Sequence, residues 1–499
     1  MDNNNSLVEA LFEKTCTLFK KYSVPFLSAF ILGLFAHGYA FTNKLLNADE
    51  TAALFSKGAD ITSGRWGLAV SSYIFPDVSM PWIYGIISLL LLSAAACVTV
   101  RIFKIKSPLL QGLLAAAMTV FPAQTGTFCF MYTSAPYALA VLLTVLSVYL
   151  CAEGKLVKNI IACLLLAFAL LIYQAYISIA ASYFVILLIL RMADGEDSAA
   201  AILKGAVKYF SLLLAALLIY LAATYIVKSA VGNGYQEYEV FAEGSILRRI
   251  FTAYSAFAKM ILKSYFGYVP SKLSMAGHIV CAAAVVFMLI YTAAKKRDAK
   301  RLVLLIFLMA IYPLSVNCLY LIASVNIIHS VSQFGFVSVY VITAVAADRF
   351  ARNKTLMAKD AVIAAMAVII IGNVFFANEI YLKMYLEYEN AYAFYNTLMA
   401  QAMETPGYSI YTVIDIVGNE HRSEYSLYSI DTKGLVGPNE NLIDIYTRCD
   451  FILNYLGQDQ YMYREDIIWI DWFYDMPVYP DPGSIMMPEG DDRVIIKLS

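Results

Sequence analysis

Two adjacent carboxylates, Asp49 and Glu50, follow the first apolar stretch of this chain, and the motif Gly64-Arg65-Trp66-Gly67 comes shortly afterwards. Ionisable side chains at the edge of a bilayer are costly to hold, so they are a functional-site hypothesis by default. A carboxylate there can act as a general base, and an arginine can stabilise a departing anion. Taken alone, each residue also has an ordinary explanation. The carboxylates fit a solvent-exposed loop, Arg65 fits an arginine that extends its charge to the membrane surface, and Trp66 fits the belt of aromatic residues at the interface. The combination favours a site, provided that the rest of the chain places it at a membrane.

The composition predicts a membrane protein. The chain has 499 residues, of which 61% are hydrophobic and 15% are charged, with a mean hydropathy of +0.67. One soluble core could not bury so much apolar surface. The net charge of −1 gives no reason to expect a nucleic-acid partner. The eight cysteines show neither CxxC nor metal-ligand spacing, so we predict no disulfide framework.

The hydropathy pattern predicts a polytopic α-helical protein with about eleven spans. Residues 159–190 are too long for one span, and Tyr173-Gln174 at their centre predicts two short helices that meet at a turn. Pro313 predicts a break in the ninth span, and the run Gly67 to Phe75 predicts an interfacial segment. The predicted spans are 24–41, 82–100, 108–121, 135–152, the two helices within 159–190, 209–227, 276–294, 302–323, 331–347 and 361–377.

The basic residues of the short loops predict the orientation. Loops 101–106, 153–158, 295–301 and 349–359 are rich in Lys and Arg, whereas loops 122–134 and 324–330 carry no charge. We therefore expect a cytoplasmic amino terminus, with the polar segments 42–81 and 228–274 as outer loops. Residues 379–499 hold 7 basic and 20 acidic residues, a net charge of −13, as expected on the translocated side.

The predicted domains are a membrane bundle over residues 1–378 and a small extracytoplasmic α/β domain over residues 379–499. Aromatic residues recur at helical spacing from Glu379 to Glu404. Segments 409–416 and 493–498 alternate as strands do, and a helix is expected over 441–456.

Other polar residues are candidates for substrate binding, but a structural role explains each of them equally well or better. Tyr173 and Gln174 can bind a ligand or can satisfy backbone groups of a helix-pair turn. Arg248 lies on a basic face of an amphipathic outer helix, which suits anionic lipid headgroups in general. Lys497 is most simply a solvated residue at the end of a strand. The sequence has no Walker motif, HExxH, GxSxG or metal-ligand cluster, so it predicts no cofactor and leaves a metal requirement open.

The chain resembles the GtrII-type membrane glucosyltransferases. The resemblance rests on the acidic pair Asp49-Glu50 after the first span, on Gly64-Arg65-Trp66, on Tyr173-Gln174, and on the ending Met476-Pro-Val-Tyr-Pro480, Gly483-Ser-Ile and Val494-Ile-Ile-Lys497-Leu. That family resembles the wider GT-C glycosyltransferases, which have an outward-facing site and a polyprenyl-phosphate sugar donor.

The resemblance implies a GT-C-like bundle that transfers a hexose, often glucose, to a bacterial surface polysaccharide such as an O-antigen. It places the acidic position of the first outer loop on Asp49 or Glu50, and it places a substrate-binding lysine on Lys497. We expect Asp49 to be the base with Glu50 orienting it, and Arg65, Trp66, Tyr173, Gln174 and Arg248 to bind substrate. A single base implies inversion at the anomeric carbon.

Two other classes fit the same span number. A lipid-linked-sugar flippase or polysaccharide exporter should show charged or broken helices near the midplane in two related halves. A non-catalytic envelope assembly protein would leave the Asp49, Glu50 and Arg65 cluster without a purpose.

Overall fold

A computed structural model describes most of the chain. The described residues are 6–52, 64–76, 78–195, 197–231, 244–262, 272–295, 298–323, 328–351, 356–419, 435, 437–438, 442–459 and 471–499.

Nine helical segments within these ranges are long and apolar enough to cross a membrane, and two shorter apolar helices accompany them. The chain is therefore a multi-pass membrane protein. Each of the eleven predicted segments overlaps one of these helices, while the number that cross the bilayer stays a prediction. The long segments are α2 (Ser23–Thr42), α5 (Pro81–Phe103), α8 (Met131–Ala152), η2 (Gln174–Tyr176) with α10 (Ile177–Asp194), α11 (Ala199–Val231), α13 (Lys272–Ala294), α14 (Ala299–Val316), η5 (Ser330–Val337) with α16 (Ser338–Arg349), and α17 (Leu356–Met403); the short ones are α6 (Pro108–Thr119) and α9 (Leu156–Ile172).

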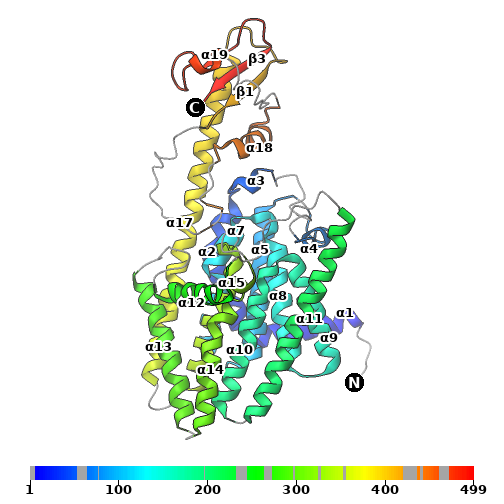
Figure 1. The fold of residues 1–499 in the computed structure, drawn as a ribbon, viewed down its shortest axis with the longest axis vertical. Coiled ribbons are helices and arrows are strands. Elements are labelled where there is room, and N and C mark those ends of the chain that lie inside the picture. Colours follow the sequence, from blue (N-terminus) through cyan, green and yellow to red (C-terminus); the bar gives the residue numbers. More distant parts are fainter. Residues whose placement is uncertain are drawn as a thin grey trace.

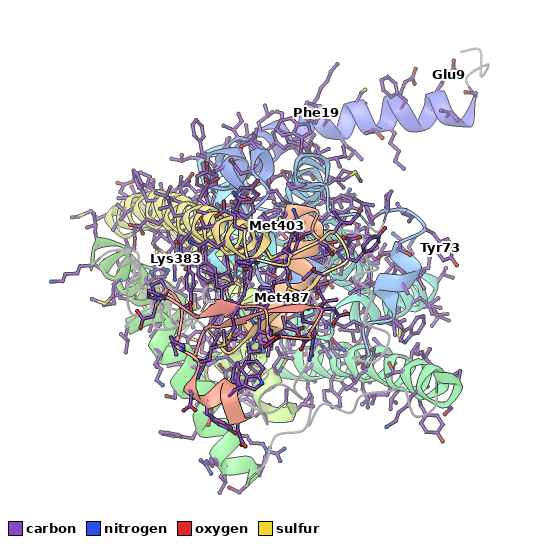
Figure 2. The ribbon with its side chains drawn as sticks, turned by 90° about the horizontal axis from the view of Figure 1, so that it is seen from above. Glu9, Phe19, Tyr73, Lys383, Met403 and Met487 are labelled. Atoms are coloured by element: carbon purple, nitrogen blue, oxygen red, sulfur yellow. The ribbon has the colours of Figure 1, made fainter. Side chains whose placement is uncertain are left out.

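Smaller elements surround the bundle (Figure 1). The helix α1 extends sideways from it, as seen from above in Figure 2, where Glu9 and Phe19 mark its length. Ser6 and Glu9 form a capping box that begins α1. The remaining elements are α1 (Leu7–Lys21), α3 (Ala48–Ala52), α4 (Gly67–Ser71), α7 (Pro122–Phe128), α12 (Ile246–Leu262), α15 (Leu319–Ile322), α18 (Ile445–Leu456), α19 (Asp471–Asp475), and the strands β1 (Val413–Val417), β2 (Ile485–Met486) and β3 (Arg493–Lys497).

The predicted helix break at Tyr173 is present. The helix α9 ends at Ile172, Tyr173 is extended with φ −153° and ψ 109°, and the 3-10 turn η2 leads into α10. The predicted break in the ninth span is also present, but it lies at Asn317, one turn after Pro313, because α14 continues through Pro313 and ends at Val316, and the separate helix α15 follows. Membrane helices tolerate an internal proline when neighbouring groups re-satisfy the freed carbonyl.

The longest helix, α17, carries the end of the chain away from the bundle. Its 48 residues are about 72 Å long at 1.5 Å per residue, more than twice the hydrocarbon thickness of a bilayer. The predicted boundary between residues 378 and 379 thus falls inside one uninterrupted helix. Above the bundle in Figure 1, α17 leads to a three-stranded sheet of order β1-β3-β2, in which β1 runs parallel and β2 antiparallel to β3.

The C-terminal region and the first loop share a hydrophobic core. The upper part of α17 contributes Phe394 and Tyr395 to this core, α18 contributes Phe451, and the strands contribute Ile414 and Val494. Leu46, which lies between α2 and α3, belongs to the same cluster. The helix α18 consequently lies directly over α3 (Figure 1). The segment that carries the acidic pair is thus packed between the bundle and the C-terminal region.

Candidate active site at the first loop

Asn47 fixes the short helix that carries the acidic pair. Its side-chain oxygen accepts a hydrogen bond of 2.9 Å from the backbone N–H of Glu50, as an N-cap residue does. Its amide nitrogen donates to the carbonyl of Cys129, just after α7. Asn47 is fully buried, so these bonds are shielded from water. The helix α3 is therefore anchored to the bundle at its first residue.

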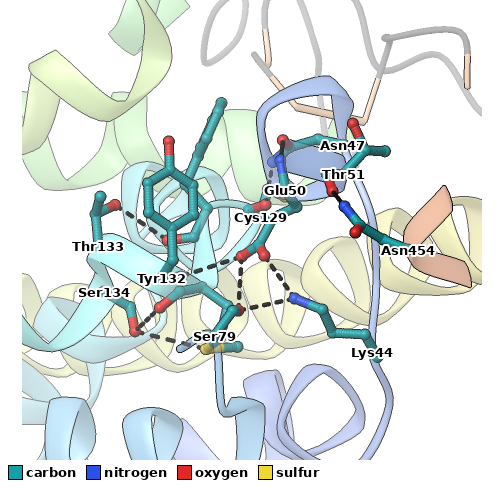
Figure 3. A network of polar contacts seen from close by, with 12 residues as sticks. Lys44, Asn47, Glu50, Thr51, Ser79, Cys129, Tyr132, Thr133, Ser134 and Asn454 are labelled. Atoms are coloured by element: carbon teal, nitrogen blue, oxygen red, sulfur yellow. Dashed lines mark hydrogen bonds and ion pairs between the residues drawn. The ribbon is translucent and has the colours of Figure 1, made fainter. Parts of the chain in front are cut away.

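Glu50 lies at the centre of a buried polar network (Figure 3). Lys44 donates to one carboxylate oxygen, with Nζ at 2.5 Å from Oε2. The hydroxyl of Ser79, at 3.2 Å, and the backbone N–H of Tyr132, at 3.0 Å, donate to Oε1. Ser79 also accepts a hydrogen bond of 2.8 Å from Lys44. Since Glu50 is fully buried and both oxygens are bonded, this carboxylate is held in one orientation.

Asp49 is exposed on the same helix, one residue before Glu50. The negative charges of Asp49 and Glu50 and the positive charge of Arg65 all act on the phenol of Tyr132. The structure thus brings both carboxylates and the predicted arginine around one tyrosine at the start of α8.

Arg65 is fixed by an aromatic cluster. Its Nη1 donates a hydrogen bond of 3.1 Å to the hydroxyl of Tyr137. The ring of Tyr137 stacks on that of Tyr173, with centroids 4.6 Å apart and planes 18° from parallel, and Tyr176 packs edge-on against both. The phenol of Tyr137 raises the pKa of the Arg65 guanidinium above its ordinary value, although burial opposes this effect. The arginine therefore stays cationic.

Gly67 allows this approach. A Cβ atom built on Gly67 would lie 2.6 Å from the backbone carbonyl of Leu171 and 2.7 Å from the nitrogen of Ile172. Any larger residue would push the first loop away from the end of α9. Glycine at this position thus brings Arg65 next to Tyr173, and it explains why the motif ends with glycine.

Trp66 and Gln174 flank the cluster. The indole Nε1 of Trp66 is buried and has no hydrogen-bond partner among the described residues. Gln174 donates a hydrogen bond of 2.9 Å to the hydroxyl of Tyr220 on α11. The charge of Arg65 acts on Tyr220 as well. Tyr173 and Gln174 are therefore brought together with the first loop, although more than 100 residues separate them in the sequence.

The structure does not bring Arg248 or Lys497 to this cluster. The side chain of Arg248 is exposed on α12, whose basic residues lie along one side of the bundle. Lys497 is buried in β3, so its interpretation as a solvated end residue is wrong. Its ammonium donates to the carbonyls of Phe473, Tyr474 and Met476, at 3.0, 3.2 and 2.9 Å, at the end of α19. Substrate binding by Arg248 and by Lys497 stays a prediction.

Several residues of the site were missed by the sequence analysis. Lys44, Ser79 and Tyr132 hold Glu50, and Tyr137 holds Arg65. One signal was available, since Lys44 is a cation six residues before Glu50 in a loop expected on the outer side. Ser79, Tyr132 and Tyr137 carry no signal of their own, because ordinary Ser and Tyr are common at the ends of membrane helices.

The C-terminal region covers the first loop. Asn454 on α18 donates a hydrogen bond of 2.9 Å to the carbonyl of Thr51 on α3. Leu435 and Gly437 are buried against α7, where a Cβ on Gly437 would lie 2.8 Å from the Cβ of Cys129. Among the described residues, no group of three or more His, Cys, Asp or Glu side chains is arranged to hold a metal ion.

A multi-pass helical bundle with a carboxylate pair, an arginine and tyrosines at one end holds the groups that a membrane enzyme acting on a polar substrate would need. The family model described as "Glucosyl transferase GtrII" matches residues 38–347, which is more than half of the chain. The protein belongs to this family, and it is a glycosyltransferase. The match includes every predicted site residue except Lys497. No curated protein and no solved structure matches the chain.

Proposed function

We propose that the protein transfers a hexose, specifically glucose, from a polyprenyl-phosphate donor to a glycopolymer of the cell envelope. The reaction takes place at the first loop, on the outer face of the membrane, with Asp49 as the general base. Membership of the glucosyltransferase family favours this function over a flippase, an exporter or an assembly protein.

The observation that carries the assignment of the base is the different burial of the two carboxylates, since Glu50 is fully buried and Asp49 is exposed. Both oxygens of Glu50 accept hydrogen bonds, and one of them is paired with Lys44. A carboxylate that is buried and fully bonded is poorly placed to accept another proton. Asp49 lies beside it, exposed and close enough to Tyr132 for its charge to act on that phenol. Glu50 therefore orients α3, and Asp49 takes the proton.

The transfer is a single displacement. The acceptor hydroxyl loses its proton to a carboxylate oxygen of Asp49 as its oxygen bonds to the anomeric carbon. The bond from that carbon to the phosphate oxygen breaks, and polyprenyl phosphate leaves with the electron pair. Phosphate is already a competent leaving group, so the step needs no acid partner. One displacement inverts the anomeric configuration.

Arg65 is the group that stabilises the departing phosphate. Its position is set by the hydroxyl of Tyr137 and by the close approach that Gly67 permits. A hydrogen-bond donor that is already in position before the reaction can stabilise the developing negative charge without having to move. The indole N–H of Trp66, which has no acceptor among the described residues, is a second donor available to a substrate oxygen.

The proposed orientation places the amino terminus in the cytoplasm. The predicted cytoplasmic ends of α5, α10 and α16 converge, since Arg349 donates to Asp194 at 3.1 Å and to the carbonyl of Phe103 at 2.9 Å. The first loop lies at the opposite ends of these helices (Figure 1). Residues 379–499 then form an extracytoplasmic cap that holds the acceptor over the first loop. The packing of α18 on α3 supports this arrangement.

The test is a transfer assay with purified full-length protein. Radiolabelled polyprenyl-phosphate glucose is incubated with envelope glycopolymers, and the anomeric configuration of the product is determined by NMR. We expect labelled polymer with inverted configuration from the wild type and almost none from Asp49→Asn. The matched control, Asp481→Asn, changes an exposed carboxylate of the C-terminal region and should transfer normally. Retention of configuration would contradict the single displacement.

A further inference from the structure

The end of α18 is held beside the carboxylate pair. Asn454 in its last turn donates to the carbonyl of Thr51, at the end of α3. The next residue, Tyr455, has its ring packed against Phe451, with centroids 5.4 Å apart, and against the edge of Tyr388 on α17, at 6.1 Å. The ring of Tyr455 is thus held between side chains of α18 and α17.

This phenol keeps its proton next to the site. Burial, together with the negative charge of Glu50, raises the pKa of Tyr455 well above its ordinary value. The hydroxyl therefore remains a hydrogen-bond donor at any physiological pH.

The hydroxyl of Tyr455 has no hydrogen-bond partner among the described residues, although its oxygen is buried. By contrast, the hydroxyl of the buried Tyr395, against whose core cluster Tyr455 packs, donates to the carbonyl of Leu442 at 3.4 Å. Buried polar atoms nearly always have a partner, so an exception beside a catalytic carboxylate needs an explanation. A ligand oxygen that arrives with the substrate provides one.

We propose that Tyr455 donates a hydrogen bond to a hydroxyl of a saccharide bound at the junction of α18 and α3. The inference rests on the proposed function and adds a contact from the C-terminal region to it. A saccharide offers many acceptor oxygens and an apolar face of C–H groups. The neighbouring rings of Tyr388 and Tyr392, whose centroids are 6.1 Å apart, supply a surface for that face, and Tyr392 is 41% exposed. The saccharide is either the hexose of the donor or a residue of the acceptor polymer.

The experiment compares Tyr455→Phe, which removes only the hydroxyl, with Tyr446→Phe on the same helix, whose side chain is 71% exposed. One neutral hydrogen bond corresponds to a change of about two- to tenfold. We expect Tyr455→Phe to raise KM by this factor for one sugar source, with an unchanged or higher melting temperature. An effect on the KM of polyprenyl-phosphate glucose identifies the donor hexose, and an effect on the KM of the polymer identifies the acceptor. Tyr446→Phe should leave both unchanged.

Unchanged KM values for both substrates would overturn the inference. It would also be overturned if Tyr455→Phe lowered the melting temperature, because the hydroxyl would then have a structural partner. If the wild type transfers no sugar, the proposed function fails. The Tyr455 contact is then tested separately, by measuring how much each of the same two substrates raises the melting temperature of the protein. A smaller stabilisation of Tyr455→Phe than of wild type supports the contact, and equal stabilisation contradicts it.

Discussion

Two regions of this protein bury charged side chains that are satisfied in different ways. In the C-terminal sheet region, Lys497 donates to three backbone carbonyls, and Arg448 donates to the carbonyls of Ile416 and Gly418. At the first loop, Glu50 is held by the side chains of Lys44 and Ser79 and by one backbone N–H, that of Tyr132.

We infer that this difference separates charges that complete the fold from charges of the proposed active site. Carbonyls at the end of a helix or strand need donors, so Lys497 and Arg448 complete their secondary structure. The first-loop network instead joins Lys44, from the segment between α2 and α3, Glu50 on α3, Ser79 just before α5, and Tyr132 on α8. These groups do not complete one helix end or one strand. Such a network fixes side-chain positions, as preorganised catalysis requires. We therefore expect substitutions in the two regions to affect different measured quantities.

The largest expected effect is that of Asp49→Asn. The substitution keeps the shape of the side chain and removes its basicity, so the rate of transfer should fall by a factor on the order of 10²–10⁴. Binding of the donor lipid and the melting temperature should change little. Single-turnover transfer and donor binding are measured on the same preparation. A wild-type rate for Asp49→Asn, with loss of transfer in Glu50→Gln, would show that the two roles are reversed.

Arg65→Ala should weaken donor binding. A charged hydrogen bond contributes about 1.5–3 kcal/mol, which corresponds to roughly a 10- to 100-fold rise in the dissociation constant for polyprenyl-phosphate glucose. Arg249→Ala is the matched control, since Arg249 is a partly buried arginine on α12 that donates to the carbonyl of Leu321 at 3.2 Å. Equal binding by Arg65→Ala and wild type would remove Arg65 from the site.

Lys497→Met tests the comparison in the C-terminal sheet region. Three carbonyls lose their donor, so the free energy of unfolding should fall by about 1.5–3 kcal/mol, measured from the denaturation of the C-terminal region. The protein that remains folded should transfer sugar with wild-type KM for the donor. A raised donor KM at unchanged stability would instead support the substrate-binding role that the family resemblance implies.

The smallest effect on activity is expected from labelling two native cysteines. Cys449 is exposed on α18, and Cys16 lies on α1, which the proposed topology places in the cytoplasm. A membrane-impermeant thiol reagent should label Cys449 in intact cells and Cys16 only after the membrane is opened. The variants Cys449→Ser and Cys16→Ser identify each signal. Labelling of Cys16 alone in intact cells would invert the topology and place the first loop in the cytoplasm.

The sequence by itself determined the class of the protein and the positions of its helices. In a bilayer, the backbone N–H and C=O groups of a long apolar run find partners within a helix. Each predicted segment therefore overlaps a helix of the structure. The turn at Tyr173 and both principal strands were predicted from local pattern, although β1 begins at Val413 and not at 409. The acidic pair and Arg65 were found because charges are rare beside membrane spans.

Only the tertiary structure decided which groups those residues meet. The pairing of Glu50 with Lys44, the bond of Arg65 to Tyr137 and the position of Asn454 on Thr51 join segments that have no periodic relation in sequence. The burial of Lys497 was missed for the same reason, because a strand residue near the end of the chain looks exposed until α19 packs against it. Local pattern reports propensity and burial, whereas partners across the fold depend on how distant helices pack.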